Sequence, residues 1–147
     1  METKELSPNK NFEEIKFIFK EVFTKEPWND DWSDDVQLNE YLLDIMGMRN
    51  SLIYGFYLNK KLIGISIGYI KHWCSGTEYM IDEFCINTDE QRKGYGTIFV
   101  KQIEDLLRQK NIHVIYLITQ KNVPAYSFYK KLGFIEQSET ISFYKEF

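Results

Sequence analysis

A short turn between an apolar run and an amphipathic run constrains the fold of this chain more than any other feature. The turn covers residues 91–97 and reads Gln-Arg-Lys-Gly-Tyr-Gly-Thr. Tyr79–Ile86 before it favours a strand, and Thr97–Lys110 after it carries apolar residues at helical spacing. Glycines and cations at such a junction can expose backbone N–H groups to an anion, and the helix dipole adds to the attraction. The turn therefore predicts an α/β fold with a phosphate-bearing ligand at this corner.

Two familiar phosphate-binding patterns do not fit this turn. A dinucleotide-binding fold needs a third glycine near Phe99, and its glycines follow their strand closely, whereas Thr88-Asp89-Glu90 intervenes here. The Walker pattern, GxxxxGK[ST], is absent. An isolated Gly-x-Gly is also compatible with an ordinary left-handed turn that opens a helix. The turn by itself leaves the ligand class open.

Length and composition favour one globular domain, residues 1–147, because 44% hydrophobic and 16% aromatic residues exclude a disordered chain. No apolar segment approaches the ~20 residues that span a bilayer, and the start, METKELSPNK, lacks the apolar core of a signal peptide. Cys74 and Cys85 form no CxxC pair and indicate no disulfide scaffold. We therefore expect a cytoplasmic protein that does not bind membranes.

The net charge of 18 − 22 = −4 argues against a nucleic-acid partner. Its distribution is uneven: residues 1–50 carry 12 acidic and 6 basic side chains, and residues 51–147 carry 10 and 12. This asymmetry suits a cationic partner on one side and an anionic ligand on the other, although inert surfaces show it as well. No cluster of metal-ligating residues stands out, so we expect no metal site.

Read in order, the chain predicts one mixed α/β domain. Residues 2–6 favour a first strand, and a helix follows with Asn11 as N-cap and Phe23 on its apolar face. Ser33 or Asp34 can cap a second helix. The remaining expected elements are strands at Ser51–Leu58, Leu62–Trp73 and Glu78–Asn87, a helix at 97–110, a strand at His113–Thr119 covered on both faces, a helix from Pro124, and a final strand pair at Phe134–Gln137 and Ile141–Phe147. We expect a mostly antiparallel sheet of about six or seven strands with about four helices.

A second segment gives the turn its meaning. Residues 122–134 read Asn-Val-Pro-Ala-Tyr-Ser-Phe-Tyr-Lys-Lys-Leu-Gly-Phe. Downstream of Gln-Arg-Lys-Gly-Tyr-Gly, this segment resembles the GNAT superfamily of acetyl-CoA-dependent N-acetyltransferases. The resemblance is close over residues 78–137 and extends in outline to the N-terminus. Two motifs in the right order, with a strand between them, are more specific than either alone. The resemblance implies a GNAT-like fold and acetyl-CoA (CoA) as cofactor.

The resemblance also implies which residues hold the cofactor. In the family, the equivalent turn wraps the CoA pyrophosphate with its backbone N–H groups. The implied contacts are Gln91, Arg92, Lys93, Gly94, Tyr95, Gly96 and Thr97. The segment Phe84-Cys85-Ile86 matches the strand end whose backbone pairs with pantetheine, so Cys85 is a core residue rather than a nucleophile. Asn122 matches the asparagine that helps to hold the CoA arm.

Tyr129 is the candidate catalytic acid. In the family motif, the tyrosine of Phe-Tyr-x-Lys-Leu-Gly-Phe points at the thioester sulfur and can protonate the departing thiolate. A free thiol has a pKa of ~8.5 and a phenol ~10, so a positioned tyrosine is a reasonable acid. The alternative is a tyrosine that only packs within its helix.

Asp82 and Glu83 are the candidate bases. An amine acceptor is mainly ammonium at neutral pH, with a pKa of ~10.4, and only the neutral amine attacks a thioester. Strand alternation sends the two carboxylates to opposite faces unless a bulge intervenes. We favour Asp82, because some aminoglycoside-modifying members carry an acid nine residues before the position of Gln91. Protein-modifying members often place a glutamate where this chain has Met80. Water is a third candidate base.

The loop Glu26–Asp35 is the candidate acceptor wall, because it carries two tryptophans and five carboxylates with no basic residue. Trp28 and Trp32 can stack on a sugar or cover a cationic amine, together with Asp82, or they can pack into the core. We expect transfer of an acetyl group to a primary amine by direct attack in a ternary complex, with backbone N–H groups near Phe84–Cys85 stabilising the oxyanion. A polyamine or aminosugar is the expected acceptor, and a homodimer is compatible with the sequence. The alternatives are a protein N-terminal or lysine acetyltransferase and a non-catalytic CoA-binding sensor.

Overall fold

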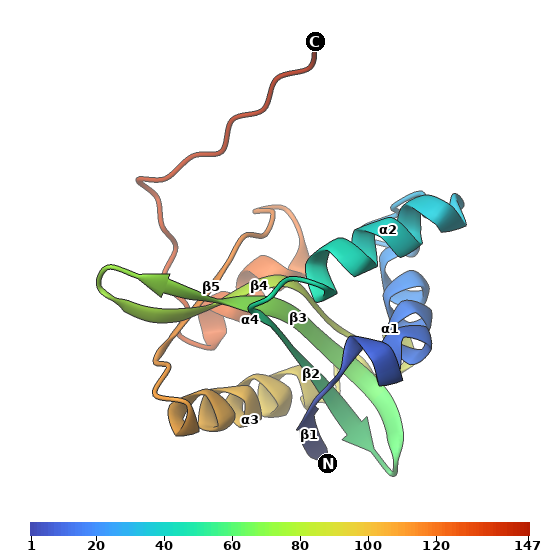
Figure 1. Ribbon diagram of the computed structural model, residues 1–147, viewed down its shortest axis with the longest axis horizontal. Coiled ribbons are helices and arrows are strands. Elements are labelled where there is room, and N and C mark those ends of the chain that lie inside the picture. Colours follow the sequence, from blue (N-terminus) through green and yellow to red (C-terminus); the bar gives the residue numbers. More distant parts are fainter.

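The computed structural model describes all 147 residues as a five-stranded sheet with helices on both faces (Figure 1). The strands lie in the order β1-β2-β3-β4-β5, and the first three pairings are antiparallel while β4 and β5 run parallel. The strands are β1 (Glu2–Glu5), β2 (Ser51–Leu58), β3 (Lys61–Trp73), β4 (Gly76–Ile86) and β5 (Val114–Leu117). The helices are α1 (Pro8–Phe23), α2 (Asp35–Met46), the short η1 (Thr88–Glu90), α3 (Tyr95–Gln109) and α4 (Pro124–Lys131).

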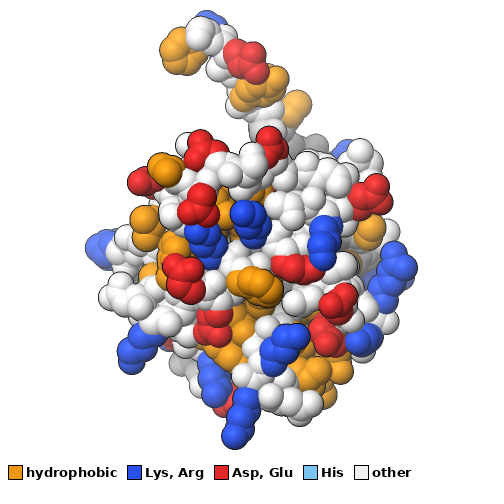
Figure 2. Space-filling model, turned by 90° about the vertical axis from the view of Figure 1, so that its right-hand side faces the viewer, with side chains coloured by type: hydrophobic (Ala, Val, Ile, Leu, Met, Phe, Trp, Pro, Cys, Tyr) orange, Lys and Arg blue, Asp and Glu red, His pale blue; other side chains and the backbone are white.

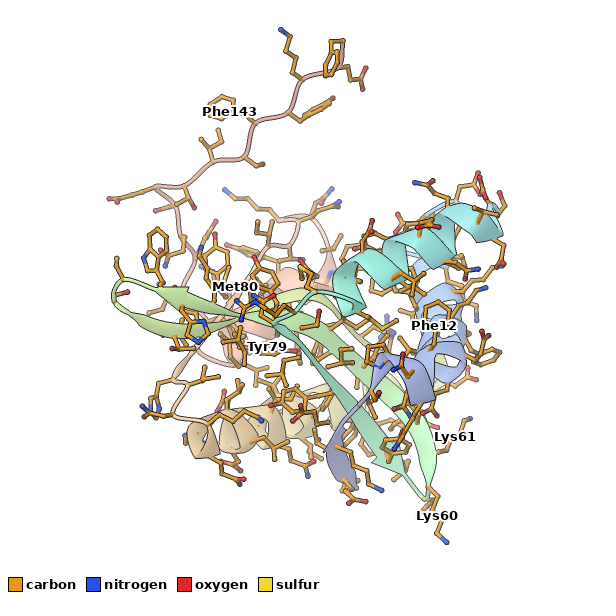
Figure 3. The ribbon with its side chains drawn as sticks, viewed as in Figure 1. Phe12, Lys60, Lys61, Tyr79, Met80 and Phe143 are labelled. Atoms are coloured by element: carbon orange, nitrogen blue, oxygen red, sulfur yellow. The ribbon has the colours of Figure 1, made fainter.

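Two hydrophobic cores lie on opposite faces of the sheet. The first core packs α1 and α2 against one face, and the second packs α3 against the other (Figure 1). Successive strand residues point to opposite faces, so Ile53 belongs to the first core and Tyr54 to the second. Tyr79 lies near the middle of the sheet (Figure 3), where its hydroxyl donates to the carbonyl oxygen of Leu52 at 3.1 Å. The predicted α/β architecture and its meander are confirmed.

The helices begin close to the predicted positions, but α1 and α3 begin earlier than expected; α3 begins at Tyr95 rather than at Thr97. Of the two predicted caps of α2, Asp34 is the one that caps it, since its Oδ1 accepts a hydrogen bond from the Gln37 N–H at 3.1 Å. Helix α1 begins earlier than expected, at Pro8 with Ser7 as N-cap, because proline suits the first helical turn. Asn11 lies inside that turn, where its Oδ1 accepts from the Ser7 N–H at 3.0 Å. No helix is both long and apolar enough to cross a membrane.

The C-terminal part of the sheet differs from the prediction. Phe134–Gln137 and Ile141–Phe147 form no strands, so the sheet has five strands rather than six or seven. The segment 138–147, here called the tail, leaves the body of the molecule and carries Phe143 away from it (Figures 1 and 3). Residues of high strand propensity form a strand when they pack on a half-buried surface. The tail packs on no such surface, since Phe143 is 90% exposed.

The fifth strand is likewise less covered than its apolar sequence predicts. We expected burial on both faces, yet β5 pairs with β4 alone and lies at the edge of the sheet, with Val114 exposed.

On the other side of the molecule, acidic and basic side chains are interspersed over the face seen from α1 and α2, and the tail stands clear above it (Figure 2). The mixed charge of this face marks it as an ordinary solvated surface.

Candidate active site

Strands β4 and β5 separate after a short stretch of pairing, and this separation positions the candidate site. They pair only where Glu78–Ile81 faces Val114–Leu117, whereas β4 continues to Ile86. The Asn87 N–H donates to the Ile63 carbonyl oxygen of β3 at 2.7 Å. By the alternation of an antiparallel ladder, the backbone groups of Phe84 then point away from β3, to the side that β5 has left. We call this region the β4–β5 opening.

A bulge at Asp82 sets which way the two acidic residues face. In the β3–β4 register Glu83 lies opposite Ile67 and Ile81 lies opposite Gly68, so Asp82 has no partner. A side chain at position 68 would not leave room for this bulge, because a Cβ there would lie 2.2 Å from the carbonyl oxygen of Met80. Asp82 is exposed as a result, and Glu83 turns toward the helices of the first core.

Glu83 is held in a partly buried, acidic environment. The Tyr41 hydroxyl on α2 donates to its Oε1 at 2.6 Å. Burial raises the pKa of Glu83 to about 7; the Tyr41 hydrogen bond opposes the rise, and the charges of Asp30 and Asp82 add to it. Partial desolvation also raises the pKa of Asp82, although that side chain is exposed. A carboxyl group that titrates near neutrality is suited to exchange protons with an amine.

The two tryptophans of the acidic loop pack against the first core with part of their surface. The Trp32 ring stacks on Tyr41 with centroids 5.2 Å apart and an interplanar angle of 21°. Trp28 packs on Phe23 at 5.8 Å, and both tryptophans stay partly exposed. The Trp32 Nε1–H is enclosed without a hydrogen-bond partner. The loop therefore has one side that faces the core. On its other side Asp30 lies close enough to Glu83 for its charge to act on that carboxyl group.

Tyr129 lies on α4 among aromatic rings at the same opening. Its ring is 6.3 Å from that of Phe84, 5.1 Å from Phe128 and 5.2 Å from Phe134. Its hydroxyl makes no hydrogen bond within the protein, and burial, together with the nearby Cys85 and Glu83, raises the pKa of this phenol, so it stays protonated at neutral pH. Burial likewise raises the pKa of the Cys85 thiol. A thiol in this state is a packing group, since only a thiolate is nucleophilic.

The glycine turn forms the N-terminus of α3 through its backbone. Gly94 adopts φ +82° as the N-cap, Arg92 adopts φ +62°, and no side chain caps the helix. Left-handed residues in such a turn gather successive N–H groups into an anion-binding concavity. Gly96 serves a different need, because a Cβ there would lie 3.1 Å from the Phe128 ring of α4. Gln91 ties the turn to β4 by donating from Nε2 to the Ile86 carbonyl oxygen at 2.9 Å.

The structure adds Tyr41 to the predicted site and brings Asp30 of the acidic loop next to Glu83. Tyr41 and Asp30 lie beside Glu83, whereas the sequence pattern assigns Tyr41 only to the apolar face of its helix. No local motif signals the contact, since 42 residues separate Tyr41 from Glu83. Asn122 is exposed in the turn before α4. Phe84 and Tyr129 contact each other at the opening, Gln91 bonds to Ile86 at the end of β4, and Glu83 lies near Asp30 of the acidic loop.

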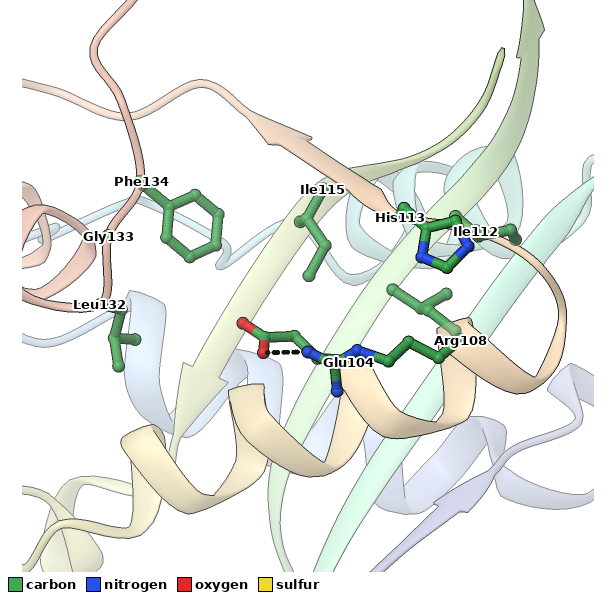
Figure 4. A pocket seen from close by; sticks show the side chains of 9 residues that line it. Glu104, Arg108, Ile112, His113, Ile115, Leu132, Gly133 and Phe134 are labelled. Carbon is green, nitrogen blue, oxygen red and sulfur yellow. Dashed lines mark hydrogen bonds and ion pairs between the residues drawn. The ribbon is translucent and has the colours of Figure 1, made fainter.

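A hollow of the surface lies away from these residues. It has a volume of about 300 Å³ and lies between α3, the start of β5 and residues 132–134, with apolar lining from Leu107, Ile115 and Phe134 (Figure 4). An Arg108–Glu104 ion pair of 3.3 Å borders it. None of the predicted site residues contributes to this hollow. It adjoins the uncovered edge strand, and its lining residue Phe134 packs against Tyr129.

Comparison with known proteins agrees with this arrangement. Residues 12–134 match the model of the acetyltransferase (GNAT) family. The chain belongs to this family, and the family together with the separated strands confirms the predicted fold. An uncharacterized N-acetyltransferase, ycf52, of Pyropia yezoensis is 34% identical over 91 residues, which are 62% of this chain and 49% of that protein. The match therefore spans about half the length of this relative.

Solved structures share the fold at low sequence identity. An aminoglycoside acetyltransferase from an uncultured soil sample, in complex with sisomicin, has a TM-score of 0.74 at 18% identity, with 99% and 95% of the two chains covered. A predicted acetyltransferase of Clostridium acetobutylicum, solved with acetyl-CoA, has a TM-score of 0.72 at 16% identity, with coverage of 97% and 95%. A ribosomal-protein-alanine N-acetyltransferase of Brucella melitensis has a TM-score of 0.73 at 14% identity, with both chains fully covered at 100%. The chain is thus a member of the acetyltransferase (GNAT) family, and these solved structures show the fold that it shares.

Proposed function

We propose that this protein transfers the acetyl group of acetyl-CoA to a primary amine of a small cationic acceptor, such as a polyamine or an aminosugar, by direct attack in a ternary complex. The observation that carries the proposal is the position of Glu83. Its carboxyl group lies beside the β4–β5 opening with a pKa of about 7, among acidic residues that attract a cation. Tyr129, its hydroxyl free of other hydrogen bonds, adjoins the same opening.

Glu83 is the proposed base, in preference to Asp82. A bound ammonium must lose a proton before it can attack, and a carboxylate whose conjugate acid has a pKa near neutrality is the better acceptor of that proton. The bulge leaves Asp82 exposed, where its charge can hold the incoming ammonium together with Asp30. Trp28 and Trp32 would line the approach and cover the cation. Water remains the competing base.

The residues of the α3 corner fit the cofactor. Gly94 has the backbone conformation that turns N–H groups outward, and Gly96 fits where a side chain would meet Phe128. The N–H groups of residues 91–97 would hold the pyrophosphate, with Arg92 and Lys93 adding positive charge and Asn122 holding the arm. Acetyl-CoA supplies a thioester carbonyl that a neutral amine can attack. The backbone of Phe84–Ile86 would hold the pantetheine in the β4–β5 opening.

Two protein groups would stabilise the negative charges that form on the carbonyl oxygen and on the departing sulfur. The Phe84 N–H faces the opening and would donate to the carbonyl oxygen as it becomes negative. The Cys85 N–H points toward β3, so only one of the two residues predicted for this role has the required direction. Tyr129 would donate its phenolic proton to the sulfur as the thiolate departs.

The main competing function is acetylation of a protein. The Brucella neighbour, by its name an acetyltransferase of a ribosomal protein, has the same fold at a similar TM-score, so the fold does not discriminate between acceptors. The acidic group of Asp30, Asp82 and Glu83 supports a cationic small molecule. A panel of polyamines, aminosugars and peptides, with release of free thiol as readout, separates these functions. Thiol release with none of them, despite acetyl-CoA binding, would favour a non-catalytic sensor.

Tyr129→Phe tests the chemical step. We expect turnover to fall about tenfold to a hundredfold while the affinity for acetyl-CoA, measured by calorimetry, stays the same, because the phenyl ring keeps the packing and loses only the proton donor. Acetyl-CoA should also raise the melting temperature of the wild-type protein, since a ligand that binds only the folded state stabilises it. Unchanged turnover in the variant would remove Tyr129 from the mechanism.

Self-association and location stay predictions. The unpaired edge of β5 and the apolar side chains of the tail, Ile141, Phe143, Tyr144 and Phe147, support a homodimer in which these surfaces are covered. Light scattering distinguishes a 17.6 kDa monomer from a dimer of twice that mass. A cytoplasmic location rests on the sequence alone.

A further inference from the structure

Tyr41 connects three segments that are far apart in the sequence. Its hydroxyl donates to Glu83 Oε1 on β4 at 2.6 Å, and its ring stacks under Trp32 of the acidic loop at 5.2 Å. The Phe19 ring of α1 lies 5.9 Å from Tyr41 and 5.5 Å from Trp32. The tyrosine is thus held from two sides by aromatic rings and has its only polar contact with the candidate base.

The hydrogen bond from Tyr41 lowers the pKa of Glu83, whereas every other contribution raises it. Burial and the negative charges of Asp30 on the loop and Asp82 on β4 favour the protonated carboxyl, whereas the Tyr41 hydrogen bond favours the carboxylate. From the far side, the Cys85 thiol on β4 and the Tyr129 phenol on α4 are the other titratable neighbours, and both stay neutral at working pH. No lysine, arginine or histidine contributes to the balance. Tyr41 is therefore the side chain that keeps the carboxylate form accessible.

We propose that Tyr41 is a positioning residue for the acetyl-transfer reaction, which fixes the Glu83 carboxylate for the acceptor amine and, through its stack with Trp32, makes that placement depend on the acceptor loop. The inference rests on the proposed function of Glu83 as base. The planar stack, with an interplanar angle of 21°, ties the tyrosine ring to the loop, so displacement of Trp32 also displaces the hydroxyl that Glu83 accepts from. An acceptor that orders the loop would thereby order the base.

Tyr41→Phe tests the first half of the proposal, with Tyr57→Phe as matched control. Tyr57 makes the same kind of contact, donating to Glu14 Oε1 at 3.1 Å, on a different part of the sheet. We expect Tyr41→Phe to move the acidic limb of the kcat/KM profile about one pH unit higher, because a hydrogen bond to a charged group is lost. The value of kcat/KM would be about tenfold lower at pH 6 and nearly unchanged at pH 9. Tyr57→Phe should leave the profile in place.

A measurement without substrate separates this proposal from the function itself. In protein labelled with carbon-13 at the glutamate carboxyls, the Glu83 resonance is assigned by its loss in Glu83→Gln and titrated in each variant. We expect its midpoint to rise in Tyr41→Phe and to stay constant in Tyr57→Phe. An unchanged midpoint in Tyr41→Phe would overturn the proposal. A raised midpoint without any change in the kcat/KM profile would overturn it as well, by removing Glu83 as base while leaving the contact intact.

Two further variants close the test. In the Glu83→Gln background, Tyr41→Phe should have no further effect on kcat, because a positioning residue acts only through the group that it positions. An additional loss of more than about threefold would contradict the proposal. Trp32→Leu, titrated in the free protein, should raise the Glu83 midpoint in the same direction as Tyr41→Phe. A constant midpoint would overturn the dependence on the acceptor loop.

Discussion

The proposed cofactor corner and the proposed acceptor side of this protein are built in different ways. The corner is formed by backbone within one short segment, where Gly94 provides a left-handed turn and Gly96 permits contact with Phe128. The acceptor side is formed by side chains from three separate segments, with Tyr41 and Glu83 42 residues apart. A backbone site depends on a few conformations that only certain residues adopt, whereas a side-chain site depends on how distant segments pack. The first kind appears as a motif and the second does not.

This difference predicts opposite responses to substitution. Changes at the corner should weaken acetyl-CoA binding and spare the chemistry. Changes on the acceptor side should alter turnover and its pH dependence while leaving acetyl-CoA affinity alone. The comparison would be contradicted if changes at the corner lowered turnover, or if changes on the acceptor side weakened acetyl-CoA binding.

The largest effect is expected for Glu83→Gln. Turnover at saturating acetyl-CoA should fall about 10²- to 10⁴-fold, because the amide cannot accept the proton of the ammonium. The calorimetric affinity for acetyl-CoA should be unchanged. The matched variant is Asp82→Asn on the adjacent, bulged residue, which should mainly raise KM for the amine. A larger loss of kcat in Asp82→Asn than in Glu83→Gln would reverse the assignment of the base.

An intermediate effect is expected for Gly94→Val. At φ +82° a β-branched residue is strained by about 1–3 kcal/mol, so the acetyl-CoA dissociation constant should rise about tenfold to a hundredfold. Turnover at saturating acetyl-CoA should stay within about threefold of the wild type. Gly96→Ala should be milder, because its Cβ meets only ring edges of Phe128 at 3.1 Å. Loss of kcat with normal affinity in Gly94→Val would place this corner in the chemistry instead.

The smallest effect concerns stability: the Glu83→Gln variant, which loses activity, should gain stability. The pKa of Glu83 is raised to about 7 in the folded protein, so between its ordinary value of 4.5 and 7 the folded state binds a proton that the unfolded chain has released. The stability of the wild type should therefore fall as the pH rises through this window. Glu83→Gln removes the effect and should be more stable than the wild type at pH 8 by about 1–3 kcal/mol, with less gain at pH 5.

Urea denaturation at pH 5 and pH 8 measures this difference. The control is Glu14→Gln, which removes the negative charge of the carboxylate that accepts from the Tyr57 hydroxyl, and it should not show the same gain at pH 8. A Glu83→Gln variant that is less stable than the wild type at both pH values would show that the carboxylate is not penalised by its surroundings.

The two regions also explain how far the sequence predicts the structure. The meander, the α2 cap at Asp34 and the turn at Gly94 follow from local patterns and are confirmed. The directions in which the Asp82 and Glu83 side chains point depend on the bulge in β4. The bulge in turn depends on the close approach of Gly68 in the neighbouring strand, so no local pattern in the sequence of β4 predicts it. The final strand pair was predicted from its apolar residues and is absent, because a strand needs a partner as well as propensity.

The central claim is that Glu83, at the β4–β5 opening, receives the proton of the acceptor amine. A crystal structure of the protein with CoA and its best amine acceptor tests this most directly. We predict that the reactive nitrogen lies within about 2.6–3.2 Å of a Glu83 carboxyl oxygen and that the CoA sulfur lies beside the Tyr129 hydroxyl. A nitrogen bound instead at Asp82, with Glu83 still closed against Tyr41 and out of reach, would contradict the account.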